Sequence, residues 1–370
     1  MTITWDQVRA WRLRRQFLEP RTDAPGAEVV SRLCGAQAQV KSSAALTALL
    51  RQAEPRPEDV EGGLADGVLL KTWAMRGTLH LLKGDEAGDF LSLAASARTW
   101  HSPPWQREFG ATPAEVEALV DAVSSALDGR VLTRDELVAA VAADAGLAKL
   151  EARLRSGWGA LLKPLAWQGA LCHGPSRGAK VTFARPGDLA PGWRGVPDPD
   201  EAAPRAIAAY LGAHGPATPD AFNAWLMRGA LRKTPLRRWF ADMGDRLTKV
   251  DVEGEEAFAL SEHVDELATA EPSRSVRLLG AFDQYVLGPG TNDPRVLAPE
   301  HRARVSRAAG WIAPVVVVGG RVTGVWEQVD DAVVVSMFPG ARKPSMSALR
   351  AEAGHLAKAR GTDVPEVRVS

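Results

Sequence analysis

The recurring order of its predicted elements is the feature that most constrains how this chain folds. Segments with apolar residues at helical spacing are followed by two short β-rich runs around a turn, and this order returns along residues 1–272. Thr133 and Thr218 each restart a helix, and they lie 85 residues apart. Three helices and a strand pair of that length are the order of a winged helix. We therefore predict a mainly α protein with small β wings, of the α+β class, built from tandem winged-helix modules.

Changes of pattern along the chain predict four domains. They are a first winged helix at 1–105, a second at 106–195, a third at 196–272, and a C-terminal α+β domain at 273–370. In the last domain, Gly319-Gly320 separates two β-rich runs, which is a strong hairpin signal.

The stretch Ala36–Val40 is predicted to connect two helices. Val29, Val30, Leu33 and Cys34 are apolar at helical spacing, and Gly35 weakens the helix that they form. Ser42-Ser43 is predicted to cap a second helix over 44–51. In extended chain Gln37 and Gln39 share a face, whereas on a helix they would point about 200° apart. Two such carboxamides can hold one water or hydroxyl, although a Gln-x-Gln alone is usually ordinary linker hydrogen bonding.

Local sequence signals also predict helices in the second module. Thr112-Pro113 opens a helix that reaches about Leu127, and Thr133 with Glu136 has the spacing of a capping box. A third helix of the second module is expected over 150–167.

Composition limits the class of protein without naming a partner. The 370 residues include 45 basic and 45 acidic side chains, so net charge gives no sign of nucleic-acid binding. No run of about 18 apolar residues is present, and residues 1–6 do not resemble a secretory signal. Two cysteines fit a reducing cytoplasm and exclude a thiolate metal site.

Basic residues are clustered locally. Arg12 belongs to an arginine-rich first helix, and Arg228, Arg232 and Lys233 belong to a later group. Such clusters suit a face that binds phosphates, although arginine-rich helices are as often solvated surfaces.

Few other residues indicate chemistry. The seven histidines show no metal-ligand spacing. Asp283 is a conceivable acid or base, but a structural carboxylate is the more common role. Thr78 and His80 alternate on the first wing and share one face. Four tryptophans are able to stack on bases but are more often packing residues; they are Trp73, Trp105, Trp167 and Trp225.

Taken together, four stretches resemble the AlkZ-type winged-helix DNA glycosylases: Ala36–Gln39, Arg76–Leu82, Phe282–Gly288 and Trp311–Trp326. The likeness covers nearly the whole chain in order. The signature of the family is glutamine, an apolar residue and glutamine, here Gln37-Ala38-Gln39. A related branch has aspartate as its last member, so Gln39 favours the AlkZ branch.

The resemblance implies a monofunctional glycosylase that needs no cofactor. It implies hydrolysis of the N-glycosidic bond of N7-alkylated purines and unhooking of azinomycin-type interstrand crosslinks, in DNA repair and self-resistance, with Gln37 and Gln39 as catalytic residues. Alkylation at N7 gives the purine a positive charge, so it leaves without a general acid. Glutamine cannot act as a base, but two carboxamide oxygens can orient a water and face the developing oxocarbenium.

A crosslinked guanine is tethered to both strands and cannot swing into a deep pocket. We therefore expect a C-shaped array with an open basic channel and both glutamines exposed on its floor. The expected partner is double-stranded DNA carrying alkylated or crosslinked guanine or adenine, and we expect a cytoplasmic, nucleoid-associated monomer without a membrane contact. The candidate DNA-binding residues are Arg12, Lys41, Arg76, Thr78, His80, Arg228, Arg232 and Lys233.

Two functions of other classes stay open at this point. A non-catalytic transcriptional regulator would use the winged helices for sequence-specific binding, but three modules in one chain are unusual for readers of two-fold operators. A scaffold would use them to bind protein.

Overall fold

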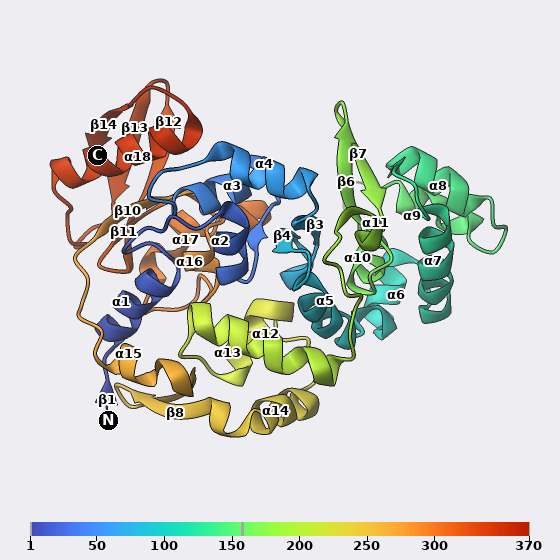
Figure 1. The fold of residues 1–370 in the computed structure, drawn as a ribbon, viewed down its shortest axis with the longest axis horizontal. Helices are drawn as coiled ribbons and strands as arrows, with labels where there is room; N and C mark the ends of the chain where they lie inside the picture. The colour runs from blue at the N-terminus through green and yellow to red at the C-terminus, as the bar shows by residue number, and fades with distance from the viewer. Residues whose placement is uncertain (1, 157–158, 370) are drawn as a thin grey trace. The chain divides into compact units, whose positions relative to one another are not determined.

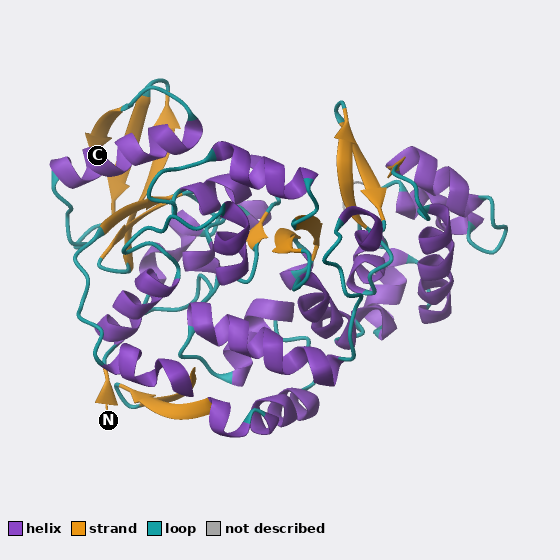
Figure 2. Cartoon of the chain, viewed as in Figure 1, coloured by secondary structure: helices purple, strands orange, loops and turns teal. Residues whose placement is uncertain are grey.

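The structure is a computed structural model that describes residues 2–156 and 159–369. It is a mixed α+β chain (Figures 1 and 2). Spatial proximity divides it into two compact units, the first made of 1–60, 207–225 and 240–370, and the second of 61–206 and 226–239. Each unit therefore combines pieces of several predicted modules, and the four-domain division stays a prediction.

The first unit contains two sheets. A three-stranded sheet has the order β1-β8-β9, formed by β1 (Thr2–Ile3), β8 (Leu247–Val252) and β9 (Glu255–Leu260). A five-stranded sheet follows the chain in order, with β10 (Val276–Leu279), β11 (Val315–Val318), β12 (Arg321–Val329), β13 (Ala332–Met337) and β14 (Glu366–Val369). The predicted Gly319-Gly320 hairpin is confirmed, because Val318 pairs with Arg321 across it.

Both faces of the five-stranded sheet are buried, which explains the unbroken valine run of β11. Val315 and Val317 pack into a cluster that includes Tyr285, while Val316 and Val318 pack into another that includes Leu349. Leu349 belongs to α18 (Met346–Arg360), which lies across the strands in Figure 1. A strand with two buried faces is apolar throughout rather than alternating.

The remaining elements of the first unit are short. They are α1 (Trp5–Arg15), α2 (Gly26–Arg32), β2 (Ala36–Gln37), α3 (Lys41–Leu49), α15 (Val264–Ala268), α16 (Gln284–Leu287) and α17 (Arg302–Val305). The 3₁₀ turns are η4 (Gly244–Arg246), η5 (Ser261–His263), η6 (Pro299–His301) and η7 (Ala308–Gly310). Four helices run through the sequence positions at which the units divide: α4 (Pro57–Ala65), α12 (Pro199–His214), α13 (Pro219–Met227) and α14 (Lys233–Asp242).

In the second unit the two predicted wings belong to one sheet. Their strands lie in the order β4-β3-β6-β7-β5. The strands are β3 (Leu69–Trp73), β4 (Leu79–Lys83), β5 (Leu132–Thr133), β6 (Cys172–Arg177) and β7 (Lys180–Ala184). Lys71 of β3 pairs with His173 of β6, so each hairpin protects an edge of the other.

Helices and helical turns complete the second unit. The α-helices are α5 (Ala87–Ser96), α6 (Pro103–Phe109), α7 (Pro113–Ala126), α8 (Arg134–Ala142), α9 (Glu151–Leu154), α10 (Leu162–Trp167) and α11 (Pro186–Leu189). The 3₁₀ turns η1 (Met75–Gly77), η2 (Thr99–His101) and η3 (Ala148–Leu150) join them. The helix start at Thr112 and the capping box at Thr133 are confirmed, and Thr112 forms a capping box as well.

Two predicted helices are corrected. The single helix over 150–167 is wrong, because α9 ends at Leu154 and α10 begins at Leu162, and the part at 157–158 lies outside the described residues. Gly159 interrupts it with φ +61°, and a Cβ there would lie 2.6 Å from the Trp73 ring. The predicted cap at Ser42-Ser43 is wrong too, since α3 begins at Lys41 after Val40.

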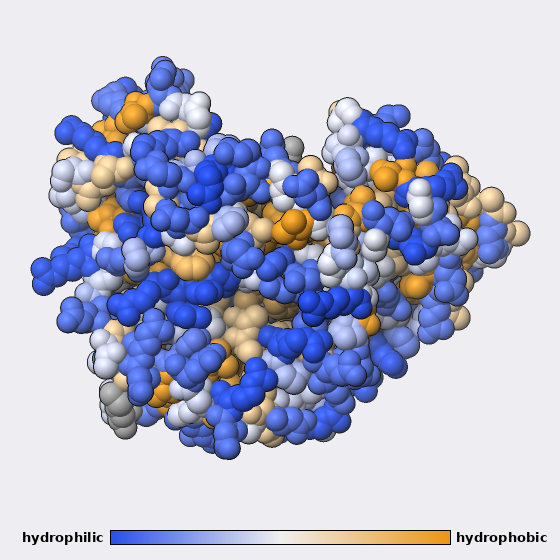
Figure 3. Space-filling view, in the orientation of Figure 1, coloured by the Kyte–Doolittle hydropathy of each residue, from blue (hydrophilic) through white to orange (hydrophobic). Residues whose placement is uncertain are grey.

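Polar and hydrophobic residues are intermixed on the face shown in Figure 3. Within 2–156 and 159–369, no helix is both long enough and apolar enough to cross a membrane.

Candidate functional site

The glutamine stretch follows an abrupt helix end. Gly35 N–H donates to Val30 O at 2.9 Å and Cys34 N–H donates to Ser31 O at 2.9 Å, the two bonds of a Schellman motif. Cys34 takes the left-handed position (φ 58°) and Gly35 also has a positive φ of 103°. A non-glycine residue in this conformation costs about 1 kcal/mol or more. The turn directs the chain out of α2 into β2, so the predicted extended conformation is confirmed at Gln37.

The two glutamines differ in exposure. Gln37 lies at the end of β2 and is only 6% exposed, whereas Gln39 lies in the following bend and is exposed. The expectation that both side chains are exposed is therefore wrong for Gln37. The strand ends between them, so they do not share one regular strand face. Gln37 is held within the fold, while the Gln39 carboxamide reaches solvent.

A pair of amides can supply dipoles and hydrogen bonds but no charge. Among the residues that the structure describes, no group of three or more His, Cys, Asp or Glu side chains could hold a metal ion. The chemistry available at Gln37 and Gln39 is therefore orientation of a water and stabilisation of a cation by carbonyl oxygens.

Arg12 has a structural role rather than the predicted DNA contact. Its side chain is buried, with Nε donating to Gly215 O at 3.0 Å and Nη2 donating to Pro216 O at 3.3 Å. Nη1 lies 3.6 Å from Asp293 Oδ2. The first helix turns this arginine toward the interior, so we remove it from the candidates.

His80 is corrected for a related reason. It is fully buried in β4, and its Nδ1 lies 3.0 Å from Thr78 O. Burial, followed by the charge of Arg76, lowers the pKa of His80 from 6.5 to about 3. A neutral, buried imidazole does not attract a phosphate at pH 7, so His80 shapes the β3–β4 sheet instead. Thr78 is half-buried and donates from Oγ1 to Met75 O at 3.1 Å.

The remaining basic candidates divide by exposure. Arg228, Arg232 and Lys233 are exposed in the connection from α13 to α14 and at the start of α14. Arg76 is half-buried in η1. The side chain of Lys41 lies outside what the structure describes.

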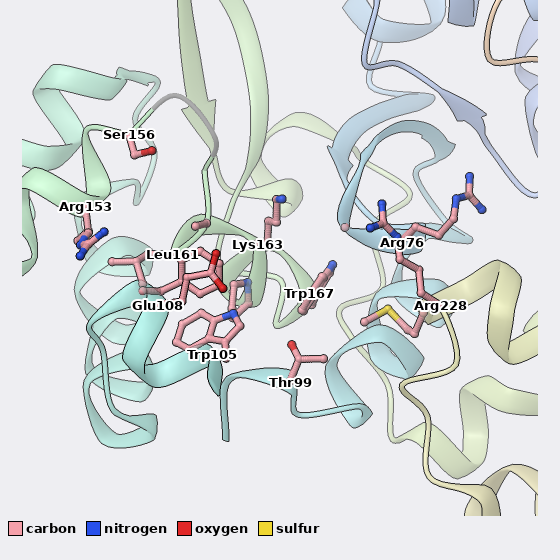
Figure 4. A pocket seen from close by; sticks show the side chains of 15 residues that line it. Arg76, Thr99, Trp105, Glu108, Arg153, Ser156, Leu161, Lys163, Trp167 and Arg228 are labelled. Carbon is pink, nitrogen blue, oxygen red and sulfur yellow. The ribbon is translucent and has the colours of Figure 1, made fainter. Parts of the chain in front are cut away.

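Within the second unit, Arg76 and Arg228 line one pocket of about 600 Å³ (Figure 4). Lys163, Trp105 and Trp167 also line it. Lys163 was not predicted as a site residue, although one signal was present: it is the single charged residue in an otherwise apolar run over 160–167.

The remaining candidates are mostly structural. Asp283 is fully buried in a bidentate ion pair with Arg51, with both N–O distances at 2.8 Å, and it also accepts the Tyr285 N–H at 2.8 Å. The structural interpretation of Asp283 is thus confirmed. Three of the four tryptophans are at most 5% exposed, and Trp105 alone among them is half-buried.

Comparison with known proteins gives similarity over the whole chain. Residues 30–359 match the family model described as DNA glycosylase AlkZ-like. The interstrand DNA cross-link repair glycosylase of Streptomyces sahachiroi is 56% identical over 370 residues, which cover all of both chains. The solved structure of the Streptomyces sahachiroi DNA glycosylase AlkZ superposes with a TM-score of 0.98, again at 56% identity and full coverage of both chains.

Proposed function

The chain belongs to the AlkZ-like family of DNA glycosylases, and on that premise we propose that it hydrolyses the N-glycosidic bond of N7-alkylated purines and unhooks DNA interstrand crosslinks. The observation that carries the proposal is the full-length similarity to a crosslink repair glycosylase. It favours an enzyme over the regulator and the scaffold. The azinomycin-type crosslink and the role in self-resistance stay predictions.

The reaction that we propose needs little acid–base chemistry. Water adds to C1′ while the bond from C1′ to the purine breaks, and the bonding electron pair neutralises the cationic base. The proton of the attacking water passes to solvent, which leaves an abasic site and a neutral alkylpurine. The transition state resembles an oxocarbenium ion. A normal purine is a much poorer leaving group, so neutral amides suffice only for the alkylated base.

Gln37 and Gln39 are our proposed catalytic residues, and we propose a different role for each. The Gln39 carboxamide is accessible and would contact the attacking water or the sugar. Gln37 is 6% exposed, so its orientation is restricted by packing, and its oxygen would present a fixed dipole. The Schellman turn at Cys34 and Gly35 supports this arrangement because it fixes where β2 begins.

DNA binding is proposed through the exposed cations. Arg228, Arg232 and Lys233 would contact phosphates, with Arg76 and Thr78 near the β3–β4 turn. Lys41 follows Gln39 closely in sequence and stays a candidate. We also propose the finer architecture expected from the sequence, tandem winged-helix modules in a C-shaped array, and a monomer that acts on nucleoid DNA in the cytoplasm.

A glycosylase assay tests this function. The full chain is incubated with a duplex bearing one N7-methylguanine or a nitrogen-mustard crosslink, and abasic sites are cleaved with alkali. We expect strand breaks at the lesion and none in unmodified duplex. Gln37→Ala and Gln39→Ala should each slow single-turnover cleavage by about 10²–10³-fold, as for removal of one preorganised dipole.

Gln168→Ala is the matched control, because Gln168 donates to Pro164 O within its own helix region and is half-buried. It should leave the rate unchanged. Absence of breaks with every lesion would overturn the function. Breaks that persist at full rate in both glutamine variants would overturn the catalytic assignment alone.

A further inference from the structure

The pocket of the second unit combines a basic side and an aromatic side. Its side chains come from η1, η2, α6, α9, the residues before α10, α10 itself, and the end of α13 with the residue that follows it. In Figure 4, Arg76 and Arg228 lie on one side, Lys163 and Trp167 lie centrally, and Trp105 lies with Glu108 toward the other side. A volume of about 600 Å³ falls within the range of small-molecule sites, about 300–1,000 Å³.

Lys163 is the central cation of this pocket. Its amine has no hydrogen-bonding or acidic partner among the described residues, and a Cβ on Gly77 would lie 4.0 Å from Nζ. Burial, followed by the charge of Arg228, lowers the pKa of Lys163. An anion placed beside Lys163 favours its charged form and so offsets both effects.

The backbone also departs from its ordinary preferences here. Arg76 and Arg228 both have left-handed φ values, 59° and 54°. Glycine follows each of them, also at positive φ, so each arginine lies in a turn where a long side chain is disfavoured. Non-glycine residues at such positions gather at ligand sites. Both arginines line this one pocket.

The aromatic side offers a flat, partly exposed surface. Trp105 is half-buried, and the centroid of its ring lies 4.9 Å from that of Phe109. Trp167 closes the pocket between the two sides, and its Nε1 is buried without a hydrogen-bond partner among the described residues. A planar heterocycle fits such a surface, because the half-buried Trp105 ring offers a face for stacking.

We propose that this pocket binds one unpaired nucleotide of DNA, with its phosphate between Lys163 and the two arginines and its base against Trp105. This deepens the proposed function and rests on its DNA substrate. Glu108 and Arg153 both line the aromatic side and carry opposite charges, so the excess of positive charge lies on the side of Lys163, Arg76 and Arg228. A nucleotide displaced beside a lesion would anchor the strand through contacts that neither glutamine provides.

The test measures binding of deoxyguanosine monophosphate and of deoxyguanosine to the full chain by calorimetry. The phosphate should strengthen binding at least about tenfold, since it supplies the charge-assisted contacts. Lys163→Gln and Arg228→Gln should each lower the affinity for the monophosphate about fivefold or more. Trp105→Ala should lower the affinity for both the nucleoside and the nucleotide, and Trp105→Phe should restore most of it.

Lys149→Gln is the control, because Lys149 is an exposed lysine of the same unit paired with Glu115. It should bind the monophosphate like the unaltered chain. Arg228 is exposed, so its variant keeps the test valid if Lys163→Gln folds poorly. Equal affinity for nucleoside and nucleotide, or no effect of either cation variant, overturns the proposal.

The source of the nucleotide is decided by competition. Saturating duplex that carries an N7-methylguanine should displace the monophosphate if the pocket takes a nucleotide of the substrate strand. Monophosphate that stays bound beside saturating DNA would indicate a site for free nucleotides and overturn the assignment to DNA. Neither arm depends on glycosylase activity, so failure here is distinguishable from failure of the proposed function.

Discussion

At the scale of single residues, burial decides which polar side chains are available for chemistry. His80 and Arg12 have the residue types of DNA-binding groups, but both are buried, and their side chains are engaged by backbone carbonyls. Exposure is a property of the packed chain, so residue type alone could not separate them from Arg228 or Arg232.

Buried neutral histidines make stability depend on pH. The pKa values of His80 and His173 fall from 6.5 to about 3, mainly through burial. In the unfolded chain both protonate below about pH 6.5, while in the folded chain they stay neutral to about pH 3. The unfolded state thus binds more protons in this range, and stability falls as pH falls. Each histidine should remove about 1.4 kcal/mol of unfolding free energy between pH 7.5 and 5.5.

Urea denaturation at the two pH values measures this loss, and His80→Gln should reduce the difference. In NMR spectra the His80 and His173 rings should show no titration between pH 5 and 8. A normal titration of His80 near pH 6.5 would contradict its neutral, buried state and restore it as a phosphate-binding candidate.

The buried ion pair of Arg51 and Asp283 provides a second prediction. Both side chains are fully buried, and each makes further hydrogen bonds, Arg51 to Thr47 O and Asp283 to the Tyr285 N–H. Asp283→Ala leaves a buried guanidinium without its counter-charge, so it should lower the unfolding free energy by about 3–5 kcal/mol. Chemical denaturation checks the value. Because the pair is structural, single-turnover cleavage per folded molecule should change little, and a selective loss of turnover would contradict that role.

At the scale of elements, local signals were predictable and interruptions were not. The helix start at Thr112-Pro113, the capping box of Thr133 with Glu136 and the hairpin at glycines 319–320 each depend on residues close in sequence, so they were predicted correctly. The break before α10 depends on Gly159 packing against Trp73, which is 86 residues away in the chain. Pairing of β3 with β6 is equally non-local, and no local pattern announces it.

Gly320, in the β11–β12 turn, and Gly340, in the turn after β13, allow a matched comparison of two glycines. Gly320 has φ +80° and Gly340 has φ +71°, so alanine is strained at both. A Cβ on Gly320 would lie 2.6 Å from Arg9 Cβ and 2.7 Å from the Tyr285 hydroxyl, whereas nothing lies within 4 Å at Gly340. Gly340→Ala should cost about 1 kcal/mol from φ alone. Gly320→Ala should cost more, by about 1–3 kcal/mol of overpacking, and thermal or urea unfolding of the two variants would show it. Equal losses would mean that the hairpin shifts without strain.

The candidate site shows the same division between local and non-local information. The extended glutamine stretch followed from Gly35 and the flanking helical patterns, and the resemblance supplied its chemistry. The unequal exposure of Gln37 and Gln39 depends on where β2 ends and what covers it. Lys163 was missed because its charge is close in space, but not in sequence, to Arg76 and Arg228.

At the scale of the whole molecule, the net charge of zero does not show which basic side chains are engaged in ion pairs and which are not. Forty-five basic and 45 acidic residues cancel, yet pairing selects which arginines remain available. Arg238 of α14 forms an ion pair with Asp200 and Arg155 with Glu151 and Asp135. Arg232, directly before α14, and Lys233, its first residue, are exposed and have no ion-pair partner among the described residues.

This difference predicts the salt dependence of DNA binding. Each phosphate contact releases counterions and contributes about −0.9 to the slope of log K against log salt concentration. Arg232→Gln and Lys233→Gln should each reduce the magnitude of that slope by about 1 and weaken binding uniformly across sequences. Arg238→Gln, on the same helix, removes a cation already neutralised by Asp200 and should leave the slope unchanged. Fluorescence anisotropy from 50 to 200 mM salt gives the slopes. If all three variants keep the slope of the unaltered chain, this part of the chain does not belong to the DNA interface. A reduced slope in the Arg232 and Lys233 variants alone would show that ion pairing, rather than net charge, selects the residues that contact DNA.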